Sequence, residues 1–226
     1  MIKTKGLSKS FGNKQVLKGI DLEFEKSKIY GIVGENGAGK TTLFRCLAGL
    51  EKHEGEIESD LSPLKNHLGL LLAEPFFLPK ITGLEYLQLL CKARGVKETA
   101  FEEKNIFDLP LQQYASTYST GMKKKLALLA ILLQKNEYFI LDEPFNGVDI
   151  QSNMILKELF LKLKQGNKTI LISSHIFGSL REICDEIHFL KDGLIQRSVK
   201  PAEFDQLENE LKGKDLNRAY EKLGLD

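Results

Sequence analysis

An apolar run followed at once by a glycine-rich octapeptide constrains this chain more than any other feature. The run is Lys28–Val33, and the octapeptide is GENGAGKT at positions 34–41, which fits the pattern G-x-x-x-x-G-K-[S/T]. The next segment, Thr41–Leu50, has helical spacing that places four apolar side chains on one face: Leu43, Phe44, Leu47 and Leu50. A strand, a glycine-rich turn and a helix in this order predict a loop whose backbone N–H groups surround a phosphate.

Each residue type in this loop has a chemical reason to be there. Glycines let backbone N–H groups turn inward, Lys40 can reach the β- and γ-phosphates, and the Thr41 hydroxyl can ligate Mg²⁺. A guanine-reading N-K-x-D motif is absent, because neither Asn13-Lys14 nor Asn167-Lys168 has Asp two positions later. We therefore expect ATP and Mg²⁺ as cofactors. The expected nucleotide-binding residues are Gly34, Glu35, Asn36, Gly37, Ala38, Gly39, Lys40, Thr41 and Thr42.

A second apolar run, at positions 138–141, ends in the two acids Asp142 and Glu143. A buried strand that delivers Asp142 beside the phosphate loop would let its carboxylate hold Mg²⁺, usually through water. The adjacent Glu143 would then orient or deprotonate the attacking water. The alternative is an acidic turn before Pro144 with no ligand.

The alternation of strand and helix patterns predicts an α/β fold with a mostly parallel core sheet. In the first 26 residues, apolar and polar side chains alternate instead, as at Ile20, Leu22 and Phe24. This alternation favours an N-terminal antiparallel β subdomain with one solvent-exposed face. Residues 187–190 and 194–196 form a predicted hairpin around Asp192-Gly193. A helical pattern over about 82–135 predicts an inserted helical subdomain. We expect one domain over 1–226, with a charged, helical tail at about 200–226 of no assigned function.

Composition excludes several classes of protein. Lys and Arg total 32 against 31 Asp and Glu, which gives no electrostatic reason to expect a nucleic-acid partner. The tight basic run Lys123–Lys125 is expected to be a solvated helix face. The three cysteines form no C-x-x-C pair, so neither a disulfide framework nor a zinc site is indicated. The apolar run Leu126–Leu133 is far shorter than the roughly 20 residues that span a bilayer, so any membrane part must come from a partner.

The motifs and their order resemble the nucleotide-binding domain of ABC transporters, over about residues 2–200. The segment YSTGM, at 118–122, is similar to the signature that this family usually writes LSGGQ. The resemblance implies that Ser119, Gly121 and Met122 bind the γ-phosphate of the ATP held by a second copy. A serine, a glycine backbone and a helix N-terminus can form such an anion site.

The resemblance extends to three single positions. Phe11 matches the aromatic residue that stacks on adenine, and base stacking tolerates any base. Asp149 matches the loop through which the two subunits communicate. His175 matches the switch histidine that contacts the γ-phosphate, and it joins Glu143 as an expected catalytic residue.

The sequence departs from the family pattern in three places. Thr120 and Met122 replace a Gly and the Gln of the signature, which leaves the Ser119 hydroxyl and the Gly121 backbone intact. In the segment LGLLLAEP, at 68–75, Ala73 stands where the family usually has a Gln that senses Mg²⁺ and the membrane partner. Either Glu74 substitutes through a one-residue shift or the contact is missing. We expect Glu74 to join Thr41 and Asp142 in the metal site.

The family resemblance implies an ATP-hydrolysing subunit that drives a separate membrane permease. Two copies, as a homodimer, would close on two ATP molecules at the cytoplasmic face of the membrane, as a peripheral complex. The signature and the run DEPFNG, at 142–147, look most like the exporter group with ABC-2 permeases, in which the permease reads the cargo.

Two alternatives stay open. The first is a soluble ABC ATPase acting on ribosomes or DNA, although the chain has neither a second fused domain nor a long coiled-coil insertion. The second is a regulatory module that binds ATP with little hydrolysis. The set Asp142, Glu143 and His175 argues against this second alternative, and Ala73 keeps it open.

Overall fold

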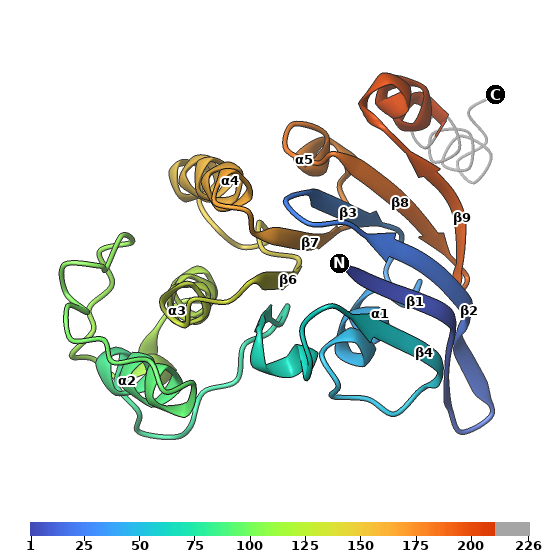
Figure 1. The fold of residues 1–226 in the computed structure, drawn as a ribbon. Coiled ribbons are helices and arrows are strands. Elements are labelled where there is room, and N and C mark those ends of the chain that lie inside the picture. The colour runs from blue at the N-terminus through green and yellow to red at the C-terminus, as the bar shows by residue number, and fades with distance from the viewer. Residues whose placement is uncertain (211–226) are drawn as a thin grey trace, which may run out of the picture.

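The computed structural model describes residues 1–210 and arranges their strands in two sheets (Figure 1). A three-stranded antiparallel sheet has the order β2-β1-β4, and a six-stranded core sheet has the order β5-β6-β7-β3-β8-β9. The strands are β1 (Ile2–Phe11), β2 (Lys14–Phe24), β3 (Ile29–Val33), β4 (Glu54–Ser59), β5 (Leu68–Leu71), β6 (Tyr138–Asp142), β7 (Thr169–Ser174), β8 (Glu186–Lys191) and β9 (Leu194–Val199). The predicted α/β fold, with an antiparallel N-terminal part and a mostly parallel core sheet, is confirmed.

The helices lie between and beside these strands. The α-helices are α1 (Lys40–Leu47), α2 (Gly83–Ala93), α3 (Thr120–Leu133), α4 (Ile150–Gln165) and α5 (Phe177–Arg181). The 3-10 helices are η1 (Leu64–Asn66), η2 (Ala115–Thr117) and η3 (Pro201–Glu203). Residues 204–210 are helical, and the rest of the predicted tail helix lies outside the described residues.

Four neighbouring strands of the core sheet bring the predicted motifs to one edge. Strands β5, β6, β7 and β3 are parallel, and all residues of β3, β6 and β7 are buried, as expected for strands covered on both faces. The register pairs Val33 with Ser174 and Asp142 with Ser173. The segments that leave these strands at the carboxyl edge are therefore neighbours in space, although they are far apart in the sequence.

The antiparallel sheet packs over the core sheet through a shared apolar cluster. Ile20, Leu22 and Phe24 of β2 are buried, in agreement with the predicted alternation. They join Leu43 and Phe44 of α1 in one cluster. Helix α1 is thereby held between the two sheets, directly after the glycine-rich loop.

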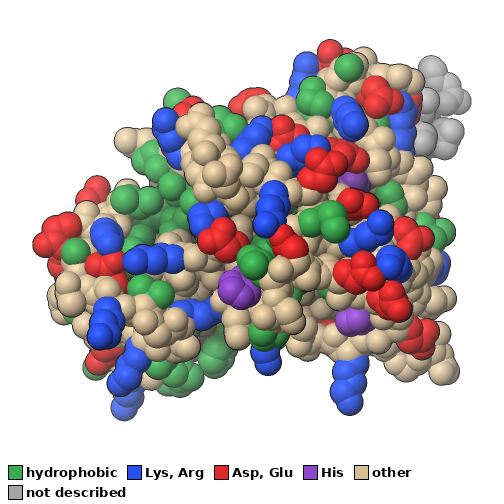
Figure 2. Space-filling model, in the orientation of Figure 1, with side chains coloured by type: hydrophobic (Ala, Val, Ile, Leu, Met, Phe, Trp, Pro, Cys, Tyr) green, Lys and Arg blue, Asp and Glu red, His purple; other side chains and the backbone are tan. Residues whose placement is uncertain are grey.

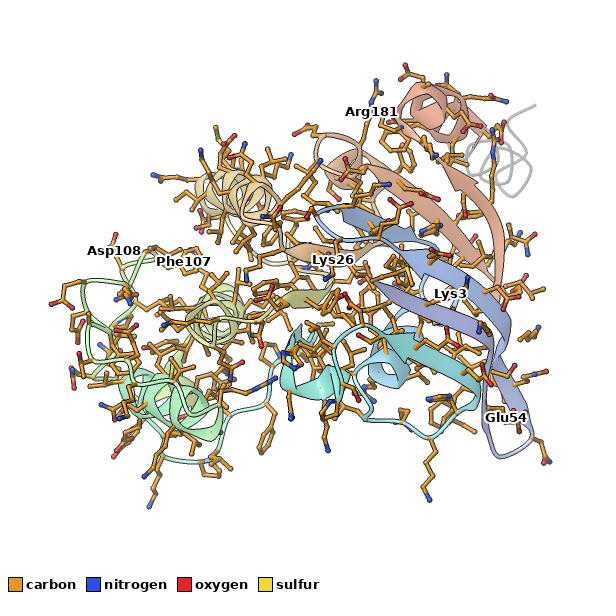
Figure 3. The ribbon with its side chains drawn as sticks, viewed as in Figure 1. Lys3, Lys26, Glu54, Phe107, Asp108 and Arg181 are labelled. Atoms are coloured by element: carbon orange, nitrogen blue, oxygen red, sulfur yellow. The ribbon has the colours of Figure 1, made fainter. Side chains whose placement is uncertain are left out.

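The helical block forms a separate apolar cluster on the β6 side of the core sheet (Figure 1). Helix α2 begins at Thr82, whose side chain forms a reciprocal capping box with Glu85. Phe107, labelled in Figure 3, packs against both this cluster and that of the core sheet. The helical pattern expected over 82–135 holds at its two ends, but residues 94–119 contain no α-helix.

Two expectations about helix faces are wrong. Helix α1 ends at Leu47, because Gly49 takes a φ of +71°, and Leu50 consequently leaves the buried face and is 59% exposed. The basic run in α3 is not a solvated face throughout, since Lys124 is buried with only 4% of its surface exposed. Its spacing puts Lys124 on the same side of the helix as the buried Ala127, Leu128 and Ile131.

The surface carries charges of both signs. Figure 2 shows basic and acidic side chains interspersed over the face that it draws, in keeping with 32 basic and 31 acidic residues. Arg181, at the end of α5 (Figure 3), pairs with Asp205 at 2.6 Å and with Glu208 at 3.1 Å, which attaches residues 204–210 to the core. Within residues 1–210, no helix combines the length and the apolar content needed to cross a bilayer.

His188 of β8 is a buried imidazole under the antiparallel sheet. Its ring stacks on Tyr30 with centroids 5.9 Å apart, and its Nδ1 lies 2.7 Å from Ser198 Oγ. The nearest carboxylate oxygen, of Glu186, is 3.9 Å from Nδ1, and Nε2 has no hydrogen-bond partner. Burial therefore lowers the pKa of His188 to about 4, because the imidazolium would lose its hydration.

This buried histidine predicts a loss of stability in mild acid. Below the unfolded pKa of about 6.5, the unfolded chain binds a proton that the folded chain excludes, so stability falls as the pH drops from about 6.5 toward 4. We expect His188→Gln to remove about 2 kcal/mol of the decrease in unfolding free energy between pH 7.5 and pH 5, measured by urea denaturation. The control His53→Gln should keep the wild-type slope, and equal slopes in all three proteins would contradict the prediction.

Candidate functional site

A cavity of about 780 Å³ opens at the carboxyl edge of β3 and β6. Its lining residues are Phe11, Lys14, Val16, Asn36, Gly37, Gly39, Lys40, Thr41, Thr42, Ala73, Glu74, Thr120, Lys124, Asp142, Glu143, Asn146, Gly147 and His175. The register of the core sheet explains this gathering, because the loops after β3, β6 and β7 all leave it at the same edge. The phosphate loop, both acids, Phe11, Glu74 and His175 therefore surround one space.

The glycine-rich loop is closely packed on its outer side. A Cβ atom on Gly34 would lie 2.2 Å from the carbonyl oxygen of Leu190, at the end of β8. Gly39 has a φ of +113° and is the N-cap of α1, so the helix begins at Lys40. The Lys40 ammonium donates to the carbonyl of Gly34 at 2.7 Å and to that of Glu35 at 3.3 Å. The cation is thus held inside the loop, where phosphate oxygens would bind.

Asp142 links the loop to two strands of the core sheet. Its side chain has no solvent exposure. Its Oδ2 accepts a hydrogen bond from Thr41 Oγ1 at 2.6 Å, and its Oδ1 accepts one from Ser173 Oγ. A hydroxyl and a carboxylate placed side by side are hard oxygen donors, the ligands that Mg²⁺ prefers together with water and phosphate. Within residues 1–210, no three His, Cys, Asp or Glu side chains group around one point.

Glu143 has two carboxylate oxygens in different surroundings. Its Oε2 lies 2.9 Å from Nδ1 of His175, whereas its Oε1 is buried, lacks a hydrogen-bond partner and lies 3.6 Å from the Lys40 ammonium. The residue has a φ of +49°, a conformation that costs a non-glycine residue about 1–3 kcal/mol. Oε1 is therefore the oxygen of this carboxylate that has no hydrogen bond of its own.

The predicted signature residues lie outside this cavity. Ser119 is the N-cap of α3, and its Oγ accepts a hydrogen bond from the N–H of Met122 at 3.3 Å. A Cβ atom on Gly121 would lie 2.6 Å from the carbonyl oxygen of Gly147, so α3 packs closely on the loop after β6. Neither these three residues nor Asp149 lines the cavity, whereas Thr120 does. Their expected role toward a second copy stays a prediction.

Asp149 has a local role in the folded chain. It caps α4 by accepting from the N–H of Ser152 at 2.8 Å, and it pairs with Lys125 at 2.7 Å. The hydrogen bond from Lys125, followed by those from Ser152, holds the pKa of Asp149 well below its usual range. The loop after β6 is consequently joined to α3 on one side and to α4 on the other.

The two remaining predicted residues lie at the rim of the cavity. Phe11 is 48% exposed, and the Lys9 ammonium lies 4.5 Å from the centre of its ring. An exposed aromatic ring at a cavity is free to stack on a base. Glu74 lines the cavity next to Ala73 and is exposed.

Sequence reasoning missed two residues whose side chains bind Asp142 or the backbone of Glu143. Ser173 donates to Asp142 and accepts a hydrogen bond from the N–H of Glu143 at 2.9 Å. The Lys124 ammonium donates to the carbonyls of Glu143 and Asn146, at 2.8 Å and 2.7 Å. Burial lowers the pKa of Lys124, and the Glu143 charge opposes this shift. The helical spacing that buries Lys124 was the signal available for it in the sequence.

The sequence pattern of the ABC transporter family matches residues 17–146, from β2 to the loop after β6. The chain belongs to the ABC transporter family. Bacitracin transport ATP-binding protein BcrA of Enterococcus faecalis is 32% identical to it, over 97% of this chain and 79% of that protein. Lantibiotic transport ATP-binding protein SrtF of Streptococcus pyogenes is 31% identical, over 92% and 93%.

Solved ABC transporter structures have the same fold. The ATP-binding subunit of one ABC transporter superposes on the chain with a TM-score of 0.81 and 24% identity, covering all of this chain and 94% of that one. The family match and the relatives confirm the resemblance to an ABC nucleotide-binding domain and the expectation of an ATP-hydrolysing transporter subunit. The roles of individual residues in this ABC domain stay predictions.

The close contact of Gly34 predicts a steric requirement for nucleotide binding by this ABC domain. In Gly34→Ala, the added methyl group must displace the Leu190 carbonyl or the loop, and such overpacking typically costs about 1–3 kcal/mol. We expect affinity for a fluorescent ATP analogue to fall about tenfold or more, because about 1.4 kcal/mol corresponds to tenfold. Gly178→Ala, in α5, is the matched control, because nothing lies within 4 Å of the added atom. Equal affinities for both variants would contradict this.

Proposed function

We propose that this ABC transporter subunit binds and hydrolyses Mg²⁺-ATP in the 780 Å³ cavity and thereby drives a separate membrane permease. The observation that carries the proposal is the meeting of Lys40, Thr41 and Asp142 with Glu143 and His175 around one space. These residue types supply phosphate charge neutralisation, oxygen ligands for a cation and a base in hydrogen-bonding reach of water.

The chain's own groups divide the work of binding. The N–H groups of the Gly34–Thr42 loop and the Lys40 ammonium would hold the β- and γ-phosphates, and Phe11 would stack on adenine. Thr41 and Asp142 would hold Mg²⁺, which when bound neutralises phosphate charge. The Thr41–Asp142 hydrogen bond already places both oxygens side by side, so little rearrangement is needed.

Hydrolysis would depend on Glu143. Its Oε1 would orient the attacking water or accept a proton from it, while His175 holds Oε2. The backbone of Glu143 is fixed at both ends, by Ser173 at its N–H and by Lys124 at its carbonyl. A carboxylate on such a fixed backbone can be placed accurately against the γ-phosphate.

A second copy of the chain would complete each site. Ser119, Gly121 and Met122 begin a helix and lie outside the cavity of their own chain, which suits a role toward the ATP of the partner. Two exposed apolar residues directly follow predicted interface residues: Ile150, 83% exposed, follows Asp149, and Ile176, 57% exposed, follows His175. Burial of these side chains against a second copy would favour a homodimer.

The permease would supply the membrane part. Phe76 and Leu78, both exposed, follow Glu74 and border the helical block, so they offer an apolar surface for contact with it. The names of the relatives, which concern bacitracin and lantibiotic transport, support the exporter group with ABC-2 permeases. The subunit would then be peripheral, at the cytoplasmic face of the membrane.

The role of Glu143 predicts a trapped dimer. In Glu143→Gln, the amide cannot accept a proton, so phosphate release should fall about 100-fold or more while the phosphate loop still binds ATP. With Mg²⁺-ATP, light scattering should then report twice the monomer mass. The control Glu137→Gln changes the residue directly before β6, at the opposite end of the strand from Glu143, and should behave as wild type. A Glu143→Gln protein that stays monomeric at saturating ATP would argue against the proposed homodimer that closes on two ATP molecules.

The proposed metal site predicts that substitution of Asp142 impairs turnover more than substitution of Glu74. We expect Asp142→Asn to abolish turnover. Glu74→Ala should raise the Mg²⁺ concentration for half-maximal turnover about threefold to tenfold, since a rim carboxylate acts on the metal through water. Glu103→Ala, an exposed acid of the helical block, is the matched control. An unchanged Mg²⁺ dependence in Glu74→Ala would remove Glu74 from the site.

A further inference from the structure

We propose that Lys124 is a positioning residue that couples the position of α3 to the catalytic backbone at Glu143. The proposal rests on ATP hydrolysis by Glu143, as argued above. The signature residues at the start of α3 are proposed to bind the ATP of a second copy, whereas Lys124, in the second turn, would position Glu143 of its own chain. The direct observation is a pair of hydrogen bonds from the Lys124 ammonium to the carbonyls of Glu143 and Asn146, at 2.8 Å and 2.7 Å.

The two hydrogen bonds connect the beginning and the end of the turn that follows β6. The accepting carbonyls belong to residues 143 and 146, at the beginning and the end of one turn, and a lysine ammonium has three N–H donors to share between them. Glu143 adopts a φ of +49°, which its own side chain disfavours. Because Lys124 binds the carbonyl and Ser173 binds the N–H, both backbone polar groups of Glu143 are hydrogen-bonded to side chains.

Burial of the ammonium gives a second reason to assign it a role. Lys124 is 4% exposed and lies on the helix face that also buries Ala127 and Leu128. An apolar side chain at this position would pack without the cost of removing a charge from water. The lysine instead places a cation at the cavity wall, close to Glu143 and Asp142, where its hydrogen bonds act on the loop that carries the catalytic base.

The same helix joins the loop at two further points. Gly121 packs on the carbonyl of Gly147, and Lys125 pairs with Asp149. Among the side chains of α3, only Lys124 has a described hydrogen bond to Glu143. A shift of α3 must therefore either break this bond or move the Glu143 backbone. If a second copy contacts the start of α3, the resulting shift of the helix would be passed by Lys124 to Glu143 of the chain that contains this helix.

The test is the kinetics of Lys124→Met, which keeps the length of the side chain and removes its donors. We expect kcat for ATP hydrolysis to fall about 10- to 100-fold, while affinity for a fluorescent ATP analogue stays within about twofold of wild type. Lys123→Met is the matched control, because the neighbouring Lys123 side chain makes no described hydrogen bond or ion pair. It should keep wild-type kinetics. Lys124→Arg, which retains donors for both carbonyls, should recover most of kcat.

A double-mutant cycle separates positioning from a general loss of structure. If Lys124 acts through Glu143, adding Lys124→Met to Glu143→Gln should lower the residual rate less than twofold, because the two residues act as one unit. Additive losses, an unchanged kcat in Lys124→Met, or equal losses in the Met and Arg variants would each overturn the proposal. Absence of hydrolysis in the wild type itself would overturn the proposed function instead, which keeps the two failures distinguishable.

Discussion

The hydrogen bonds that Asp142 accepts from Thr41 and Ser173 hold the site together, because they join the start of α1 to the ends of two parallel strands. Thr41 lies in the first turn of α1, Asp142 ends β6, and Ser173 lies near the end of β7. Asp142 has no solvent exposure, so its carboxylate depends on these donors for the hydrogen bonds that water would otherwise supply. Ser173, which donates to this carboxylate, also accepts from the N–H of Glu143, the next residue in the chain.

The sequence predicted those parts of the site in which a single continuous segment carries both the pattern of a strand or helix and the functional side chains. The octapeptide at 34–41 specifies a strand end, a turn and a helix start, and the run at 138–143 specifies a buried strand with its two acids. Ser173 could not be found in this way, because its role depends on the pairing of β6 with β7, which no local pattern reveals. Lys124 was misjudged for another reason: its charge suggested solvent, although helical spacing placed it with buried residues.

The fold expectations failed where a single backbone conformation overrides periodicity. The apolar spacing from Leu43 to Leu50 continues for one more turn, but Gly49 in the left-handed region ends α1 first. Likewise, the apolar residues between 94 and 119 pack on α2 and α3 from turns and extended segments rather than from a helix.

Helix α3 has two different parts. The signature residues at its start lie outside the cavity, whereas Lys124 in its second turn lines the cavity. Ser119 is the N-cap of α3, and neither it nor Gly121 or Met122 lines the cavity of its own chain, although Thr120 does. One turn later, Lys124 reaches the carbonyl of Glu143 on the cavity wall. Ser119 and Lys124 belong to the same helix, so the proposed coupling requires only that α3 move as one body. In the proposed dimer, a second copy that binds at the start of α3 would therefore also act on Glu143, the proposed base for the first copy's own ATP.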